Sequence, residues 1–230
     1  MIRWGRAVAA LAVAVLLAGC GGEEQLPGLA FEEDPVGSQA RGPGQVVLQF
    51  AQAARAGDGA RMAPLLSAST YDTLGPRALG DIADDFAEFV DGRVVLSLRL
   101  DDDWAVGAVA GRSEDDGDPA AYAAALRLEE GAWRIELGGV VFGRLRPGPL
   151  DEVDESPELR AEAQAGGEIE KLLVWVDGRP VRGFARYGRF TAELRGRLAE
   201  RLSPGVHAVV VFGRTAETAG ALAWPFEVES

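Results

Sequence analysis

Two residues with reactive side chains, Cys20 and His207, each occur once in this chain. One thiol and one imidazole are too few for a structural zinc site of histidine and cysteine ligands or for any centre with several histidines. We also expect no Cys/His catalytic pair, and the sequence contains no glycine-rich phosphate loop of the Walker type. A lone histidine could act as a base or a pH sensor. No partner motif accompanies His207, so we expect it to pack in a strand or lie at the surface, and we expect no cofactor.

Acidic turns are the remaining candidates for a metal site, because carboxylates hold hard cations. The acidic runs are Asp101–Asp103, Glu114–Asp118 and Glu129–Glu130. In a meander of strands, alternate turns lie at the same end, and a strand of about ten residues separates the two ends by roughly 34 Å. One site cannot use all three runs. We therefore interpret them as solvated turns that discourage edge pairing, and predict no metal site.

Cys20 follows a basic start and a short apolar run. Arg3 and Arg6 precede residues 7–18, which are all apolar. As a helix this run would cover about 18 Å, against roughly 30 Å for a bilayer core. It is typical of a secretory signal and too short for a membrane span. The motif Leu-Ala-Gly-Cys ending at Cys20 resembles the lipobox of bacterial lipoproteins, which implies cleavage before Cys20 and a lipid on its sulfur.

The charge of the chain argues against nucleic-acid binding. Its formal net charge is −13, whereas nucleic-acid binding needs a basic surface. One basic stretch stands out, and its arginines are a candidate patch for an anionic partner: Arg179, Arg182, Arg186 and Arg189. This patch could contact anionic headgroups, an anionic wall polymer or the acidic first domain, or it could be a solvated surface.

The first half of the folded chain is expected to begin with helices and continue as a sheet. Apolar residues recur at helical spacing from Gln45, with Pro43 near the start, and further helices are predicted at 60–66 and 78–90. Alternating apolar residues then predict four strands with one buried and one wet face, near 94–100, 104–110, 122–128 and 133–137.

Two stretches carry a family resemblance in this half. The opening "QVVLQFAQAARAGDGARMAPLLS" and the hairpin "ALRLEEGAWRIEL" resemble the nuclear transport factor two-like, or cystatin-like, family. The family implies helices on a bent antiparallel sheet, often with a pocket. Enzymes of this family place an acid or histidine base and a donor inside the pocket. Residues of suitable types here are Tyr71, Asp72, Asp81 and Arg99.

The second half is rich in strands after a proline-rich acidic segment. Strands are expected at 172–176, 190–194, 206–212 and 222–228, with Pro225 favouring an edge position. The segments "VWVDGRPV", "LSPGVHAVVVFG" and "GALAWPFEV" together resemble bacterial immunoglobulin-like domains. The expected fold class is therefore an α+β cone, with helices on a bent antiparallel sheet, followed by an all-β immunoglobulin-like sandwich.

These expectations give a domain plan and a function. The plan is a lipoprotein signal peptide at 1–19, a flexible acidic tether at 20–44, a cystatin-like domain at 45–146, a linker at 147–157 and an immunoglobulin-like domain at 158–230. The expected protein is anchored to the cell membrane through lipid on Cys20 and faces the extracytoplasmic side. It would act as a non-catalytic binding or scaffold module for an envelope protein or polymer. The alternative is a small-molecule-binding or cyclase/isomerase-like protein that uses the cone cavity.

Overall fold

The structure is a computed structural model that describes residues 23–25, 42–74, 79, 89–114 and 116–229. Several of the predictions above lie outside these residues. They are the signal peptide at 1–19, the lipidation site Cys20, the candidate pocket residue Asp81 and most of the helix expected at 78–90.

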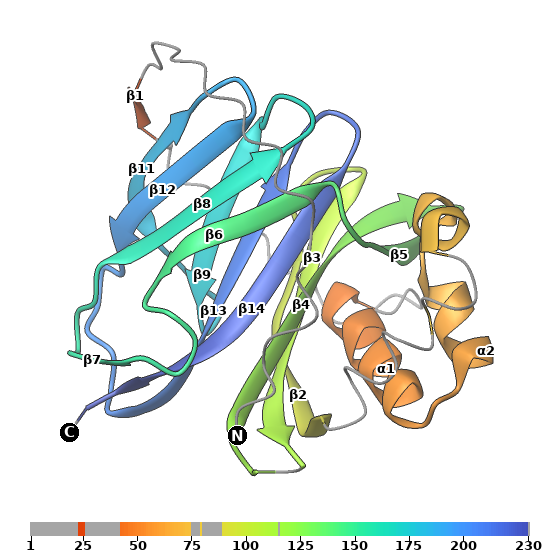
Figure 1. Cartoon of the computed structure of the whole chain (residues 1–230), viewed down its shortest axis with the longest axis horizontal. Helices are drawn as coiled ribbons and strands as arrows, with labels where there is room; N and C mark the ends of the chain where they lie inside the picture. The colour runs from red at the N-terminus through yellow and green to blue at the C-terminus, as the bar shows by residue number, and fades with distance from the viewer. Residues whose placement is uncertain (1–22, 26–41, 75–78, 80–88, 115, 230) are drawn as a thin grey trace.

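The described chain forms three sheets and a group of helical segments (Figure 1). The helices are α1 (Pro43–Arg55), α2 (Gly59–Met62) and the 3-10 helix η1 (Ala63–Leu65), and residues 68–74 are also helical. The helix-side sheet has the order β2 (Phe89–Arg99), β3 (Trp104–Ser113), β4 (Pro119–Glu129) and β5 (Ala132–Glu136).

The other two sheets have five strands each. The middle sheet has the order β10 (Arg179–Pro180), β9 (Lys171–Val176), β13 (Gly205–Arg214), β14 (Ala219–Val228) and β7 (Glu152–Val153). The outer sheet has the order β1 (Glu23–Gln25), β11 (Arg182–Tyr187), β12 (Thr191–Arg197), β8 (Leu159–Ala165) and β6 (Val140–Arg146). Neighbouring strands are antiparallel in all three sheets except for the parallel pair β7 and β14.

Helix α1 forms where the sequence predicts it. Pro43 occupies the first turn, and the apolar face of the helix, including Val47 and Phe50, is buried against the helix-side sheet, chiefly β2 and β3. Asp58 then caps α2, because its side chain accepts a hydrogen bond from the backbone N–H of Arg61 at 3.1 Å. The start of α1 lies very close to β3: a Cβ added to Gly107 would be 2.6 Å from the carbonyl oxygen of Pro43. Only a glycine at this position allows such an approach.

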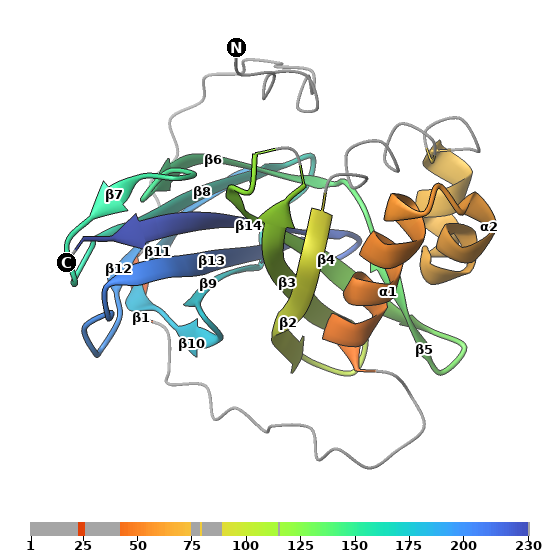
Figure 2. The same cartoon turned by 90° about the horizontal axis from the view of Figure 1, so that it is seen from below.

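The middle sheet is buried on both faces. One face of β9 and β13, with Val174 and Val211, packs against the outer sheet. The opposite face, with Trp175 and Phe212, packs against the helix-side sheet. The layers therefore follow one another as outer sheet, middle sheet, helix-side sheet and helices, from left to right in Figure 1 and from a different direction in Figure 2.

The predicted fold class, an α+β cone followed by an immunoglobulin-like sandwich, is wrong. The structure is mostly β, with 55% of the described residues in strands and 16% in helices. The helical segments cover one face of one sheet. The alternation along 94–137 suggested that the other face is wet, but β3 is buried on both sides because the middle sheet packs against it. In the second half, the middle sheet lies between two layers, the outer sheet and the helix-side sheet.

The segment that connects the two halves of the chain forms strands of the outer and middle sheets. Val140–Arg146, which the domain plan places in the first domain, pairs as β6 with β8 in the outer sheet. Within the expected linker, Glu152–Val153 pairs as β7 with β14. The chain leaves the helix-side sheet at Gly138 and Gly139, whose φ angles are 94° and 82°. Phe89 and Val90, expected at the end of a helix, begin β2.

Candidate functional site

The structure does not assemble the candidate pocket residues. Tyr71 and Asp72 are exposed on the helical segment 68–74, and Arg99 is exposed at the end of β2. Arg99 donates to the backbone oxygen of Asp101 at 3.0 Å and to the carboxylate of Asp102 at 2.8 Å. Among the described residues no hydrogen bond joins Tyr71, Asp72 and Arg99, and Asp81 lies outside that set.

A buried polar cluster nearby was not predicted from the sequence. The Ser67 hydroxyl donates to the Glu136 carboxylate at 2.5 Å and accepts a hydrogen bond from the backbone N–H of Thr70 at 3.2 Å. Thr70 in turn accepts from the backbone N–H of Leu137 at 2.9 Å. Ser67 is fully buried and Glu136 is 7% exposed, and the hydroxyl of the exposed Ser69 also donates to the Glu136 carboxylate at 3.0 Å. The role of this cluster is to cap the helical segment 68–74 and fasten it to β5.

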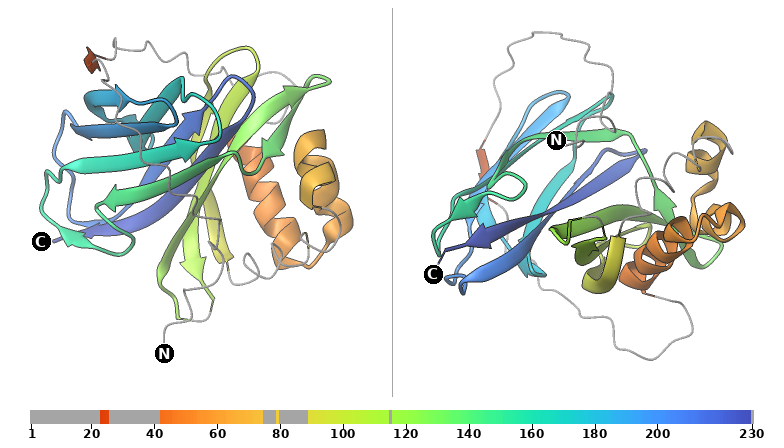
Figure 3. Two further views of the ribbon diagram at one scale, coloured as in Figure 1. Left: turned by 45° about the horizontal axis from the view of Figure 1, so that its top comes forward. Right: turned by 60° about the horizontal axis from the view of Figure 1, so that its bottom comes forward.

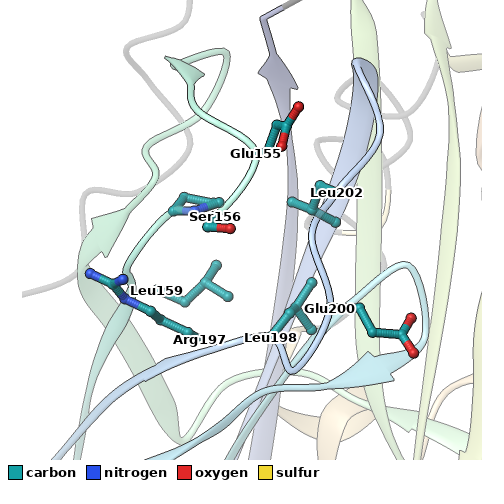
Figure 4. A pocket seen from close by; sticks show the side chains of 8 residues that line it. Glu155, Ser156, Leu159, Arg197, Leu198, Glu200 and Leu202 are labelled. Atoms are coloured by element: carbon teal, nitrogen blue, oxygen red, sulfur yellow. The ribbon is translucent and has the colours of Figure 1, made fainter.

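A small hollow lies at one end of the outer and middle sheets (Figure 4). Its lining includes Glu155, Leu159, Arg197 and Leu202. The space is about 10 Å³, enough for about one water molecule, whereas ligand pockets usually measure about 300–1,000 Å³. This hollow is therefore too small to hold a metabolite.

His207 holds a turn in place. Its Nδ1 atom is 2.6 Å from a carboxylate oxygen of Asp177, and its Nε2 atom is 2.7 Å from the backbone oxygen of Ser203. The other oxygen of Asp177 accepts from the backbone N–H of Ala208 at 2.9 Å. Both ring nitrogens are thus occupied within the protein, and the residue is 7% exposed. The histidine links the turn after β9 to β13.

One of the acidic turns joins two sheets. The Asp101 carboxylate, at the end of β2, pairs with Arg214 of the middle sheet at 2.5 Å and lies 3.9 Å from the ammonium group of Lys171. Its second oxygen accepts from the backbone N–H of Trp104 at 3.0 Å. The sequence predicts a solvated turn here, but Asp101 connects the helix-side sheet to the middle sheet.

The structure separates the four arginines of the predicted patch. Arg182 and Arg186 lie on β11 and point to the exposed side of the outer sheet, because Ala185 between them is buried. Arg179 lies on β10 of the middle sheet, 3.7 Å from Asp177. Arg189 lies in the turn after β11, where its guanidinium is 4.9 Å from the ring centre of Phe190.

Further arginines, which the sequence analysis did not single out, extend the exposed side of the outer sheet. Across the strands, Arg182 is opposite Arg197, and Arg195 is opposite Arg160, which is opposite Arg146. We call this surface the arginine face, which consists of Arg146, Arg160, Arg182, Arg186, Arg195 and Arg197. Along 159–165 and 191–197, small or apolar residues alternate with charged or polar ones. This alternation could have predicted the arginine face if the pairing of the two strands, which run side by side in Figure 3, had been known.

Glu193 balances part of this charge. Its carboxylate forms ion pairs with both Arg160 and Arg195, the latter at 2.8 Å. Burial raises the pKa of the Glu193 carboxyl, but the hydrogen bond from Arg195 and the charges of both arginines outweigh it, so the pKa lies below its usual value. The hydrogen bond and charge of Glu193 raise the pKa of Arg195. Glu162 forms an ion pair with Arg144 at 3.1 Å.

Three arginines of the face keep their charge uncompensated. Within the part of the chain that the structure describes, no ion pair involves Arg146, Arg182 or Arg197, and all three are exposed. Phe184, directly opposite Arg195, is 59% exposed. The arginine face therefore combines free guanidinium groups with an exposed aromatic ring, in a protein that is acidic as a whole.

Comparisons with protein-family models and with curated proteins find no match for this chain, so the family resemblances given above stay predictions. None of the helices in the described segments combines the length and apolar character needed to cross a membrane. Those segments also contain no group of three or more histidine, cysteine, aspartate or glutamate side chains placed to hold a metal ion.

Proposed function

We propose that this chain is a membrane-anchored extracytoplasmic lipoprotein that acts as a non-catalytic binding or scaffold module in the cell envelope. The proposed anchor is lipid on Cys20, and the proposed binding surface is the arginine face. The observation that carries the proposal is the contrast between the two candidate sites. The arginines gather on one exposed sheet face, whereas Tyr71, Asp72 and Arg99 do not assemble around a cavity.

The stacked architecture supports a role in binding. The middle sheet is buried on both faces, and Asp101 joins it to the helix-side sheet through Arg214. The arginine face is therefore part of a layer that packs directly on this shared core. A surface supported in this way keeps its arginines at fixed spacings, which reduces the entropy lost when a partner binds.

The anchor is tested by Cys20→Ser in cells that export the full chain. We expect the original protein to stay with the membrane fraction after a high-salt wash, because acyl chains hold it independently of charge. Cys20→Ser should leave that fraction and retain residues 1–19, which the mass of the N-terminal peptide reports.

Gln25→Ser is the matched control, a serine substitution a few residues later that should behave like the original protein. An unchanged membrane fraction and N-terminal mass for Cys20→Ser would rule out the lipid anchor.

A further inference from the structure

We propose that the arginine face lies flat on anionic phospholipid headgroups of the membrane that anchors the chain. This inference rests on the function proposed above and adds the surface that meets the membrane. The partner is defined by its chemistry: a layer of phosphate groups with acyl chains beneath it.

Charge complementarity favours phosphate as the ligand. Arg146, Arg182 and Arg197 are exposed and lack an ion pair among the described residues. A guanidinium group presents a planar fork that matches a phosphate group. The net charge of −13 does not prevent contact, because charges more than about 8 Å apart are largely screened at physiological salt. The local surface therefore decides what binds.

Phe184 favours a membrane over a hydrated polymer. Its side chain is 59% exposed, and it stands between Arg182 and Arg186 on the same side of β11. An exposed phenyl ring gains free energy when it enters an apolar layer, and such a layer lies directly beneath lipid headgroups. Phe190, which is 41% exposed and stacked with Arg189, lies just beyond the same strand. A soluble polyanion offers no comparable apolar layer.

The proposed anchor, Cys20, lies close in sequence to the strand β1, which pairs with the β11 edge of the outer sheet. Strand β1 pairs with β11, with Glu23 opposite Arg186 and Gln25 opposite Phe184. Cys20 precedes Glu23 by three residues, which can span at most about 11 Å. A lipid attached at Cys20 therefore holds the β11 edge of the outer sheet within reach of the headgroups.

The acidic first half of the chain is not a competing partner for the same face. The inner side of the outer sheet packs against the middle sheet, and the helix-side sheet lies beyond that (Figure 1). The arginine face thus points away from the helices and from the helix-side sheet. Among the described residues, no other layer covers this face.

The experiment uses the full lipidated chain reconstituted in vesicles, with one introduced cysteine that carries a fluorescent label. Thr191→Cys places the label on the exposed side of β12, and Thr73→Cys places it on the helical segment at the other end of the stack. Vesicles of phosphatidylcholine alone are compared with vesicles that also contain phosphatidylglycerol, both with a headgroup-attached quencher. We expect quenching of the label at 191, only with phosphatidylglycerol, and no quenching of the label at 73.

Neutralising two free arginines should weaken docking. Each arginine near an anionic membrane contributes about a factor of five, so Arg182→Gln with Arg197→Gln should lower the docking equilibrium about thirtyfold. The matched control is Arg61→Gln with Arg112→Gln, two exposed arginines on α2 and β3, which should change nothing.

The outcomes separate this inference from the proposed function. A lipidated N-terminal peptide without quenching at 191, or quenching that survives Arg182→Gln with Arg197→Gln, would overturn the inference and leave the anchor in place. A response to soluble dextran sulfate but not to phosphatidylglycerol would identify a polymer site and also overturn it. An N-terminal peptide without lipid would overturn the proposed function itself.

Discussion

At the scale of single residues, Glu193 controls how much positive charge the arginine face presents. It is the one carboxylate shown to pair with two arginines of that face, Arg160 and Arg195, within the described segments. The same pairing lowers the pKa of the Glu193 carboxyl, so the residue is ionised at neutral pH. A neutral residue at position 193 should therefore strengthen binding to an anionic partner and lower the stability of the fold.

Glu193→Gln should strengthen docking on phosphatidylglycerol vesicles several-fold, because it releases Arg160 and Arg195 from their shared carboxylate. Quenching of the label at 191 measures the change. Glu227→Gln, at an exposed position of β14, removes the same charge elsewhere and should leave docking unchanged. Equal effects of the two substitutions would mean that overall charge, and not the arginine face, governs binding.

The pairing of Glu193 also predicts a pH dependence of stability. A carboxyl whose pKa is lower in the folded state stabilises the fold above its unfolded pKa, and this stabilisation is lost as pH falls through the folded pKa. The difference in unfolding free energy between the original protein and Glu193→Gln is expected to be under about 1 kcal/mol. It should shrink as the pH falls below 4.5, the ordinary pKa of a glutamate carboxyl. Denaturant titrations at neutral and acidic pH measure it, and a difference that grows on acidification would contradict this account.

At the scale of elements, the sequence predicts the helices and strands whose apolar residues recur with one clear period. Pro43 and the apolar spacing after it predict α1, and Asp58 predicts the cap of α2. Strands β9 and β13 also lie where the sequence predicts strands. Their uninterrupted apolar runs, such as 172–176, are typical of strands buried on both faces. Strand β8 was missed because its inward residues are mostly alanines, which give weak alternation.

The contact between α1 and β3 gives a prediction at this scale. Gly107→Ala should lower the free energy of unfolding by about 1–3 kcal/mol, because the new methyl group would meet the backbone of Pro43. Gly143→Ala is the matched control, since a Cβ there meets nothing within 4 Å. Denaturant unfolding monitored by circular dichroism compares the two variants. Similar stabilities would show that α1 does not approach β3 as described.

At the scale of the whole molecule, the stacking of three sheets was beyond the reach of sequence reasoning. Each half of the chain shows a plausible set of strands, but the core formed by Trp104, Trp175 and Phe212 exists only where the halves meet. The same limit applies to the arginine face. Its members come from β6, β8, β11 and β12, so only the cross-strand register brings them together.

This arrangement gives the molecule two ends of different character. The helical end exposes Tyr71, whose side chain is 40% exposed, and the outer sheet exposes Phe184 at 59% and Phe190 at 41%. If the arginine face meets the membrane, these aromatic side chains must differ in their access to solvent. They can report the orientation of the native protein without any substitution.

Hydroxyl-radical footprinting of the lipidated protein, in its native membrane and in neutral detergent, tests the central claim most directly. We predict that oxidation of Phe184 and Phe190 falls in the membrane, because the headgroups cover the arginine face, while oxidation of Tyr71 stays the same. Equal oxidation of Phe184 in membrane and detergent, or protection of Tyr71 in its place, would contradict the claim.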